Sequence, residues 1–201
     1  MMNYFTKMLV WNFFMLLFLL VGEVNAQSSR DRVWILGVGL NAINDSGLSN
    51  DGLFNFKTNY SFSRPFKFSV EKKMNAKHGL ELKTLLNRFK TNKKFNNGFP
   101  TKDIDFFGID AMYKYYFLYN EPSYSSKRIK KVSMYGTIGP GVSFFNDLTN
   151  ITVNIGGGIN YPIGKQLDLN LQVTPKISVS NKASSNNYYQ FEFGVLYYLK
   201  N

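Results

Sequence analysis

Hydrophobic and polar positions alternate with a period of two along the segment 167–179, "LDLNLQVTPKISV". The odd positions hold Leu, Val, Pro or Ile, and the even positions hold Asp, Asn, Gln, Thr, Lys and Ser. Such alternation predicts a β-strand with one apolar and one polar face. The segment is long, because strands of soluble proteins usually have about 5–6 residues. The first question is therefore whether the apolar face packs against a protein core or faces lipid.

The same alternation recurs in seven other segments of the chain. They span about 33–43, 64–73, 80–89, 104–118, 132–145, 149–161 and 188–199. Eight long alternating strands joined by turns predict an antiparallel meander. The polar segment 44–63 is expected to be a loop, and no helical period is found after residue 26. We therefore expect one all-β domain, residues 27–201.

The first 26 residues predict a secretory signal peptide that is cleaved from the mature chain. An apolar run, Leu9–Val21, precedes "GEVNA", which places Val24 and Ala26 at the small-residue positions of a cleavage site. The run is shorter than the roughly 20 residues of a membrane-spanning helix. Gln27, rather than a cysteine, follows the cut, so we expect no lipid anchor.

Charges of both signs lie in the middle of the polar strand faces. A soluble barrel turns its apolar face inward around a ligand, whereas a membrane barrel turns it outward and keeps polar residues in the lumen. In the second arrangement these charges form a lumen network of Lys67, Glu71, Glu81, Lys83, Asp110, Lys114, Lys176 and Glu192.

Aromatic residues on the apolar faces gather near the strand ends and favour the membrane barrel. With the mature N-terminus in the periplasm, they form two bands at two heights, as interfacial girdles do. The inner band is Trp34, Tyr115, Phe117, Tyr161 and Tyr197, and the outer band is Phe66, Phe107, Phe144 and Tyr189. Most strands also reach the roughly 9–11 residues that a tilted spanning strand needs. We therefore predict an eight-stranded, up-and-down transmembrane β-barrel in the outer membrane of a Gram-negative bacterium.

Several glycines share the polar face of the strands. By parity, Gly37, Gly39, Gly108, Gly139, Gly141, Gly156, Gly158 and Gly194 face the lumen. An eight-stranded barrel has room inside only for side chains. We expect these glycines to leave space for larger side chains from the opposite wall and to let the sheet bend.

The net charge of +11 indicates an anionic neighbour. For an exported protein, lipid head groups, lipopolysaccharide or surface glycans are better candidates than nucleic acid, and solvated loop lysines are the plain alternative. Lys90, Lys93 and Lys94 in an outer loop are the candidate contacts. The chain has no cysteine, so it relies on neither disulfides nor thiolate chemistry.

Catalytic residues are scarce in this sequence. His78 is the only histidine, and it falls in a predicted inner turn. No cluster of His or Cys could hold zinc, so we expect no catalytic residues, no metal and no cofactor. The lumen charges have two interpretations. They line a narrow solute path, or they form an ion-paired plug that satisfies buried polar groups.

Three motifs resemble the N-terminal barrel of OmpA-family outer-membrane proteins, in their Bacteroidetes-type form. They are "WILGVGLNAINDSG" at 34–47, "KDIDFFGIDAMYKYYF" at 102–117 and "YGTIGPGVSFF" at 135–145. The resemblance implies an eight-stranded barrel with roles in envelope integrity, adhesion and sometimes slow solute passage. The chain resembles the barrel half alone, so we expect no peptidoglycan-binding domain.

Three functions remain open at this point. The leading one is a non-enzymatic, monomeric barrel that supports the envelope or binds lipopolysaccharide, glycans, host proteins or neighbouring proteins through its outer loops. The second is a small porin that passes ions or small solutes through a narrow polar lumen. The third is a soluble or membrane barrel that binds a ligand. A lipid-modifying enzyme is disfavoured by the single histidine.

Overall fold

The computed structural model describes residues 33–45, 55–96, 98–119, 131–146, 148–179 and 187–199. The predicted signal peptide lies outside the described residues, as does most of the basic connection 119–131. The elements in the described part are β1 (Trp34–Asn44), α2 (Phe56–Asn59), β2 (Tyr60–Ser61), β3 (Ser63–Lys73), β4 (His78–Phe89), β5 (Ile104–Leu118), β6 (Ser133–Phe145), β7 (Leu148–Pro162), β8 (Leu167–Ser178) and β9 (Tyr188–Tyr198).

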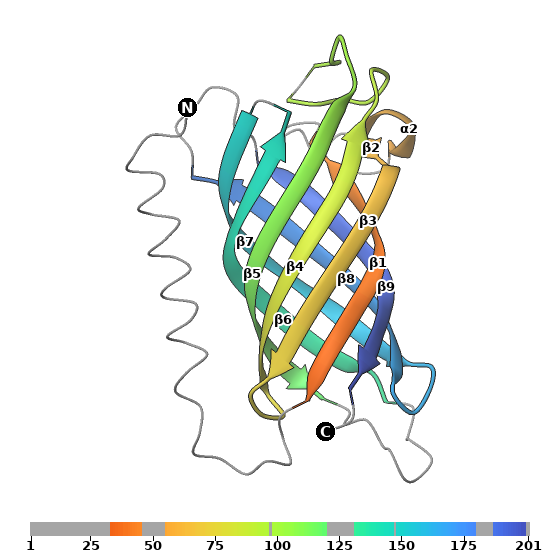
Figure 1. Ribbon diagram of the computed structural model, residues 1–201, viewed down its shortest axis with the longest axis vertical. Coiled ribbons are helices and arrows are strands. Elements are labelled where there is room, and N and C mark those ends of the chain that lie inside the picture. Colours follow the sequence, from red (N-terminus) through yellow and green to blue (C-terminus); the bar gives the residue numbers. More distant parts are fainter. Residues whose placement is uncertain are drawn as a thin grey trace. The chain divides into compact units, whose positions relative to one another are not determined.

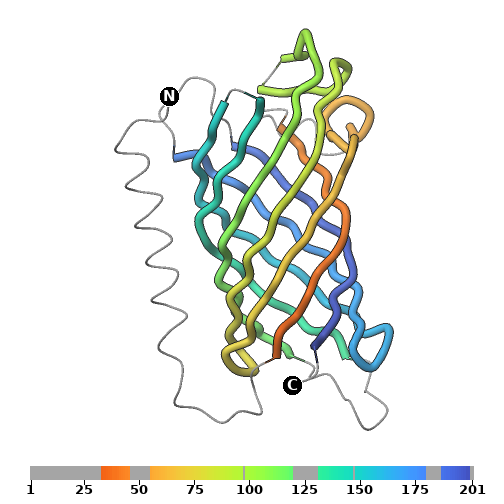
Figure 2. Tube along the Cα trace, in the orientation of Figure 1, coloured from red at the N-terminus to blue at the C-terminus, as the bar shows by residue number. Residues whose placement is uncertain are grey.

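Eight long antiparallel strands, β1 and β3 to β9, form a closed barrel. Each strand pairs with the next one along the chain, and β1 also pairs with β9, which closes the sheet. The tilted strands and the closed wall are visible in Figure 1 and Figure 2. The strand boundaries expected from the alternation agree with the structure to within two residues. The predicted fold is confirmed.

The alternating pattern places polar side chains inside the barrel and apolar side chains outside. In β8, Leu171 and Val173 are exposed, whereas Asn170 and Gln172 are buried. This follows from the pleat, because successive side chains of a strand point to opposite faces. The barrel is thus built the opposite way from a soluble protein, which buries its apolar face.

The polar segment 44–63 differs from the expected loop, because it contains α2 and β2. The side chain of Asn55 caps α2 by accepting a hydrogen bond from the backbone N–H of Thr58 at 3.3 Å. Tyr60 and Ser61 then pair with the end of β1. One helical turn and a two-residue strand are too short to produce a periodicity, so the sequence pattern missed them. No helix among the described residues has the length and apolar character that a membrane span requires.

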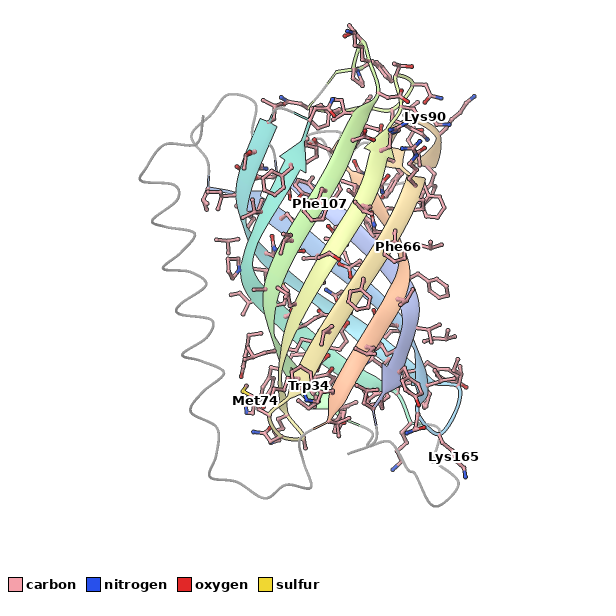
Figure 3. All side chains as sticks on the ribbon, in the orientation of Figure 1. Trp34, Phe66, Met74, Lys90, Phe107 and Lys165 are labelled. Atoms are coloured by element: carbon pink, nitrogen blue, oxygen red, sulfur yellow. The ribbon has the colours of Figure 1, made fainter. Side chains whose placement is uncertain are left out.

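The two ends of the barrel differ in their connections. The turn end carries the short connections 74–77 and 163–166, and the loop end carries α2 and the connection 90–103. Figure 3 shows Trp34, Met74 and Lys165 at the turn end, with Phe66 and Phe107 closer to the loop end and Lys90 beyond them.

Candidate functional site

The eight charged residues expected in the lumen all lie inside the barrel. Their side chains come from β3, β4, β5, β8 and β9, and each residue is 3% exposed or less. Alternate positions of neighbouring strands bring them together, because they share the inward face of the sheet.

The first ion-pair chain crosses the lumen through Glu192. One oxygen of this carboxylate lies 2.5 Å from Lys67 Nζ, and the other lies 2.5 Å from Lys83 Nζ. Lys83 Nζ is also 3.7 Å from Asp110, and Asp110 accepts hydrogen bonds of 2.7 and 2.8 Å from Lys176. Five side chains from five strands are therefore joined in one network, which ties together distant parts of the wall.

The second chain lies around Lys114, nearer the turn end. Its ammonium group is 3.0 Å from Glu71 and 3.1 Å from Glu81. The Tyr116 hydroxyl donates to Glu71 at 2.8 Å, and Lys73 Nζ lies 3.4 Å from the centroid of the Tyr116 ring. The buried charges are thus stabilised by ion pairs, hydrogen bonds and an aromatic face.

The predicted network omitted Lys73 and Asp168, although the alternation along 167–179 already placed Asp168 on the polar face. Asp168 is fully buried and accepts a hydrogen bond from the Tyr198 hydroxyl at 2.8 Å. Strand parity also places Lys73 inward, since it shares the inward face of β3 with Glu71. Among the described strand residues, buried lysines and buried carboxylates are equal in number: Lys67, Lys73, Lys83, Lys114 and Lys176 against Glu71, Glu81, Asp110, Asp168 and Glu192. These ten charges cancel one another, and Asp45, which follows β1, is the one further buried charge in the described part of the chain. The described charges outside this set are mostly lysines and arginines.

A cluster of buried apolar side chains fills the lumen toward the loop end, and we call it the aromatic seal. Phe106 and Phe145 lie 5.0 Å apart between ring centroids, and Phe95 from the connection 90–103 packs 5.1 Å from Phe145. The full cluster consists of Ile43, Leu85, Phe89, Phe106, Phe145 and Tyr188, with Phe95 and Ile104 packed against it. These residues face inward by parity, but the alternation gave no sign that they meet at one height.

The aromatic seal lies directly against the ion-pair network. Lys176 Nζ is 5.6 Å from the centroid of the Tyr188 ring, and the Tyr188 hydroxyl lies 2.5 Å from Ser143 Oγ. Since the residues of the seal and the lumen charges are almost completely buried, side chains fill the interior. This agrees with the narrow interior of an eight-stranded barrel.

One of the two roles expected for the lumen glycines, leaving space for side chains of the opposite wall, is wrong. A Cβ on Gly139 would lie 2.0 Å from the carbonyl oxygen of Ala111, and one on Gly39 would lie 2.2 Å from that of Phe193. A Cβ on Gly158 would lie 2.4 Å from the hydroxyl of Tyr135, its pairing partner in β6. The crowding thus comes from the neighbouring strand and not from the opposite wall, and glycine permits this close approach of two backbones.

The nine aromatic residues expected in the girdles all point outward. Trp34, Phe66, Phe107, Tyr115, Phe117, Phe144, Tyr161, Tyr189 and Tyr197 are between 37% and 65% exposed. Trp34 and Phe66 lie at different heights in Figure 3. His78 joins the aromatic residues of the turn end: its Nδ1 contacts the Tyr113 hydroxyl, and its ring lies 5.4 Å from that of Tyr115. No group of three or more potential metal ligands occurs among the described residues.

Comparisons with known proteins relate the chain to solved barrel structures. No family model matches the chain, and no curated protein matches it. The outer membrane protein OprG from Pseudomonas aeruginosa matches with a TM-score of 0.55 and 14% identity, over 85% of this chain and 98% of that chain. The N-terminal barrel domain of Pseudomonas aeruginosa OprF has a TM-score of 0.50 and 12% identity, over 84% of this chain and 98% of that chain. Neisserial surface protein A matches with a TM-score of 0.50 and 14% identity, over 82% of this chain and 96% of that chain.

These likenesses show the fold, an eight-stranded antiparallel barrel of the kind found in outer-membrane proteins. The Bacteroidetes-type resemblance stays a prediction.

Proposed function

We propose that the chain is a non-enzymatic outer-membrane β-barrel of a Gram-negative bacterium, with a closed lumen and a structural or surface-interaction role. The observation that carries this proposal is the combination of an apolar outer wall with an interior filled by paired charges and aromatic rings. In a bilayer, a closed barrel satisfies every backbone hydrogen bond between its strands and exposes its apolar side chains to lipid.

The outer wall supports the membrane location. Large hydrophobic side chains on all eight long strands are more than a third exposed, including Val38, Leu82, Ile109, Ile155 and Phe193. Soluble monomers rarely expose contiguous apolar patches beyond a few hundred Å². The soluble ligand-binding barrel is disfavoured for this reason, and the filled lumen leaves no described space for an interior ligand.

Localisation is tested by fractionation of the producing bacterium and by gel mobility without heating. We expect the chain in the outer-membrane fraction, with an unheated band that migrates differently from the boiled band because the closed barrel stays folded in detergent. A soluble periplasmic protein that shows a single mobility would contradict the proposal.

The filled lumen disfavours the small porin. Conduction requires a water-accessible path, whereas the charged lumen residues are 3% exposed or less and the aromatic seal covers them on one side. In planar bilayers, the purified protein is expected to give no steady channels. A stable, ion-selective conductance would instead support the porin.

The partners in this proposal are anionic molecules at the membrane surface, since the positive charge lies outside the lumen. The loop lysines contribute unequally. Lys93 Nζ donates to the backbone carbonyls of Lys57 at 2.8 Å and Phe56 at 3.4 Å, so it holds α2 against the connection 90–103. Lys90 is exposed and available to a ligand.

The monomer and the absence of enzymatic activity belong to the same proposal. A closed barrel has no free sheet edge through which it would pair with another copy. His78 lies among the aromatic residues of the turn end, and its Nδ1 contacts a tyrosine hydroxyl. A hydrolase would instead place its histidine between a nucleophile and an acidic residue.

A further inference from the structure

A groove of about 650 Å³ crosses the outer surface of β3, β4, β5 and β6 near the loop end. Its apolar side is a row of ladder partners: Phe66 pairs with Leu86, Leu86 with Phe107, and Phe107 with Phe144. The rings of Phe107 and Phe144 are stacked at 6.0 Å. Phe66 and Phe107 are visible on the outward face in Figure 3.

A polar row borders this apolar row on the side of the loop end. It consists of Arg64, Arg88, Asp105 and Asn146, and all but Arg88 line the groove directly. Arg88 forms a two-pronged ion pair with Asp105, with distances of 2.5 and 3.0 Å. Asn146 Oδ1 accepts a hydrogen bond from the backbone N–H of Asp105 at 3.0 Å. Asp105 and Arg88 thus neutralise each other.

Arg64 is the remaining charge of the groove. It is exposed, and its side chain makes no hydrogen bond or ion pair within the described part of the chain; its electrostatic interaction there is with Asp105, which Arg88 already holds. Its guanidinium is therefore available to a ligand, whereas that of Arg88 is occupied. The site consequently presents one positive charge above an apolar row.

The backbone at Arg64 adopts a conformation that an arginine seldom takes. The register between β3 and β4 shifts between Ser63 and Phe66, which marks a β-bulge, and Arg64 has a φ of 59°. The left-handed region is unfavourable for residues with a Cβ and is ordinarily occupied by glycine. Bulges re-aim side chains and occur often beside functional sites. The bulge therefore places Arg64, whose guanidinium forms no ion pair, at the edge of the apolar row.

We propose that this groove binds a phosphorylated lipid of the outer leaflet, the lipid A part of lipopolysaccharide, with one phosphate on Arg64 and an acyl chain along the aromatic row. This inference rests on the proposed membrane orientation, in which the loop end faces the cell exterior. Guanidinium groups bind phosphate through two parallel hydrogen bonds. A chain lying on Phe66, Leu86 and Phe107 continues the contact into the hydrocarbon region.

The test is a titration of the folded full chain in neutral detergent micelles with lipid A, followed by native mass spectrometry. Lipid A with its phosphates is expected to bind, and dephosphorylated lipid A, phosphatidylglycerol and inorganic phosphate are expected to bind much more weakly. Arg64→Gln should lower the affinity about tenfold or more, as expected for the loss of a charged hydrogen-bond donor. Lys165→Gln is the matched control, since it removes one positive charge at the opposite end and should leave binding unchanged.

Two further variants separate ligand binding from folding. Arg64→Gly should weaken binding as Arg64→Gln does, yet keep the thermal stability of the parent, because glycine adopts a positive φ freely. Phe66→Ala should weaken binding, whereas Phe68→Ala, the next outward residue of β3 and outside the groove, should not.

The proposal is overturned if Arg64→Gln and Lys165→Gln bind lipid A equally well, or if phosphatidylglycerol binds as tightly as lipid A. Either result leaves the proposed function standing, provided that the unheated mobility and the outer-membrane location are observed. A chain that shows neither of those properties would remove the proposed function itself.

Discussion

At the scale of single residues, Glu192 joins two lysines of the lumen network. It lies 2.5 Å from both Lys67 and Lys83, which come from two different strands, and all three side chains are almost completely buried. Gln190 also donates a hydrogen bond to the same carboxylate at 2.5 Å. Removing one partner of a buried ion pair leaves an uncompensated charge, which is costly in a poorly solvated interior.

Replacing Glu192 by Gln is expected to lower the free energy of unfolding by about 3–5 kcal/mol, because two lysines lose their shared counter-charge. Urea unfolding of the protein refolded into lipid vesicles measures this change. The matched control is Asp103→Asn in the exposed connection 90–103, where we expect a change within about 0.5 kcal/mol. Equal effects of the two substitutions would mean that the ion-pair network does not support the barrel.

At the scale of the strands, several glycines allow neighbouring strands to approach each other closely. Gly139 of β6 faces the backbone of β5, and Gly39 of β1 lies opposite Gly194 of β9. At these points even a methyl group would overlap a main-chain carbonyl, which cannot move aside as a flexible side chain can.

Gly139→Ala is expected to destabilise the barrel by about 1–3 kcal/mol, the usual range for overpacking, and to slow refolding into detergent. Gly164→Ala in the turn 163–166 is the control, because its added Cβ would find its nearest neighbour at 3.5 Å. The unfolding transition and the fraction of unheated, folded band report both effects. If the two variants behaved alike, the close approach of β5 and β6 would not limit this position.

The positions of the strands could largely be predicted, because a period of two indicates a strand and shows which of its residues share a face. The parity of β3 and β8 placed Lys67 and Lys176 inside and Leu171 outside, as the structure has them. The contacts between these residues could not be predicted, since Lys67 and Glu192 meet only when β1 closes against β9. The aromatic seal was missed for a related reason. Parity tells which face of a strand a residue lies on, but not its position along the barrel axis, so Phe89, Phe106 and Phe145 could not be joined into one cluster.

At the scale of the whole molecule, charge is divided between a paired interior and a basic exterior. The buried strand residues pair their charges, so the interior offers little attraction to ions, whereas the described lysines and arginines outside it lie near the strand ends and in the connections. Together with the apolar wall, this division suits a barrel that holds its shape in a bilayer and meets anionic molecules at its surfaces.

The central claim is that the odd-numbered leucines of β8 lie in lipid, and depth-dependent fluorescence quenching tests it most directly. Trp11 and Trp34 are replaced by Phe, and one new tryptophan is introduced as Leu171→Trp or, as the control, Lys165→Trp in the turn 163–166. The proteins are reconstituted in vesicles that contain phospholipids brominated at different depths of the acyl chain. We predict strong quenching of the Leu171→Trp protein by deep bromines and weak quenching of the Lys165→Trp protein. Weak quenching of both proteins at every depth would contradict the account.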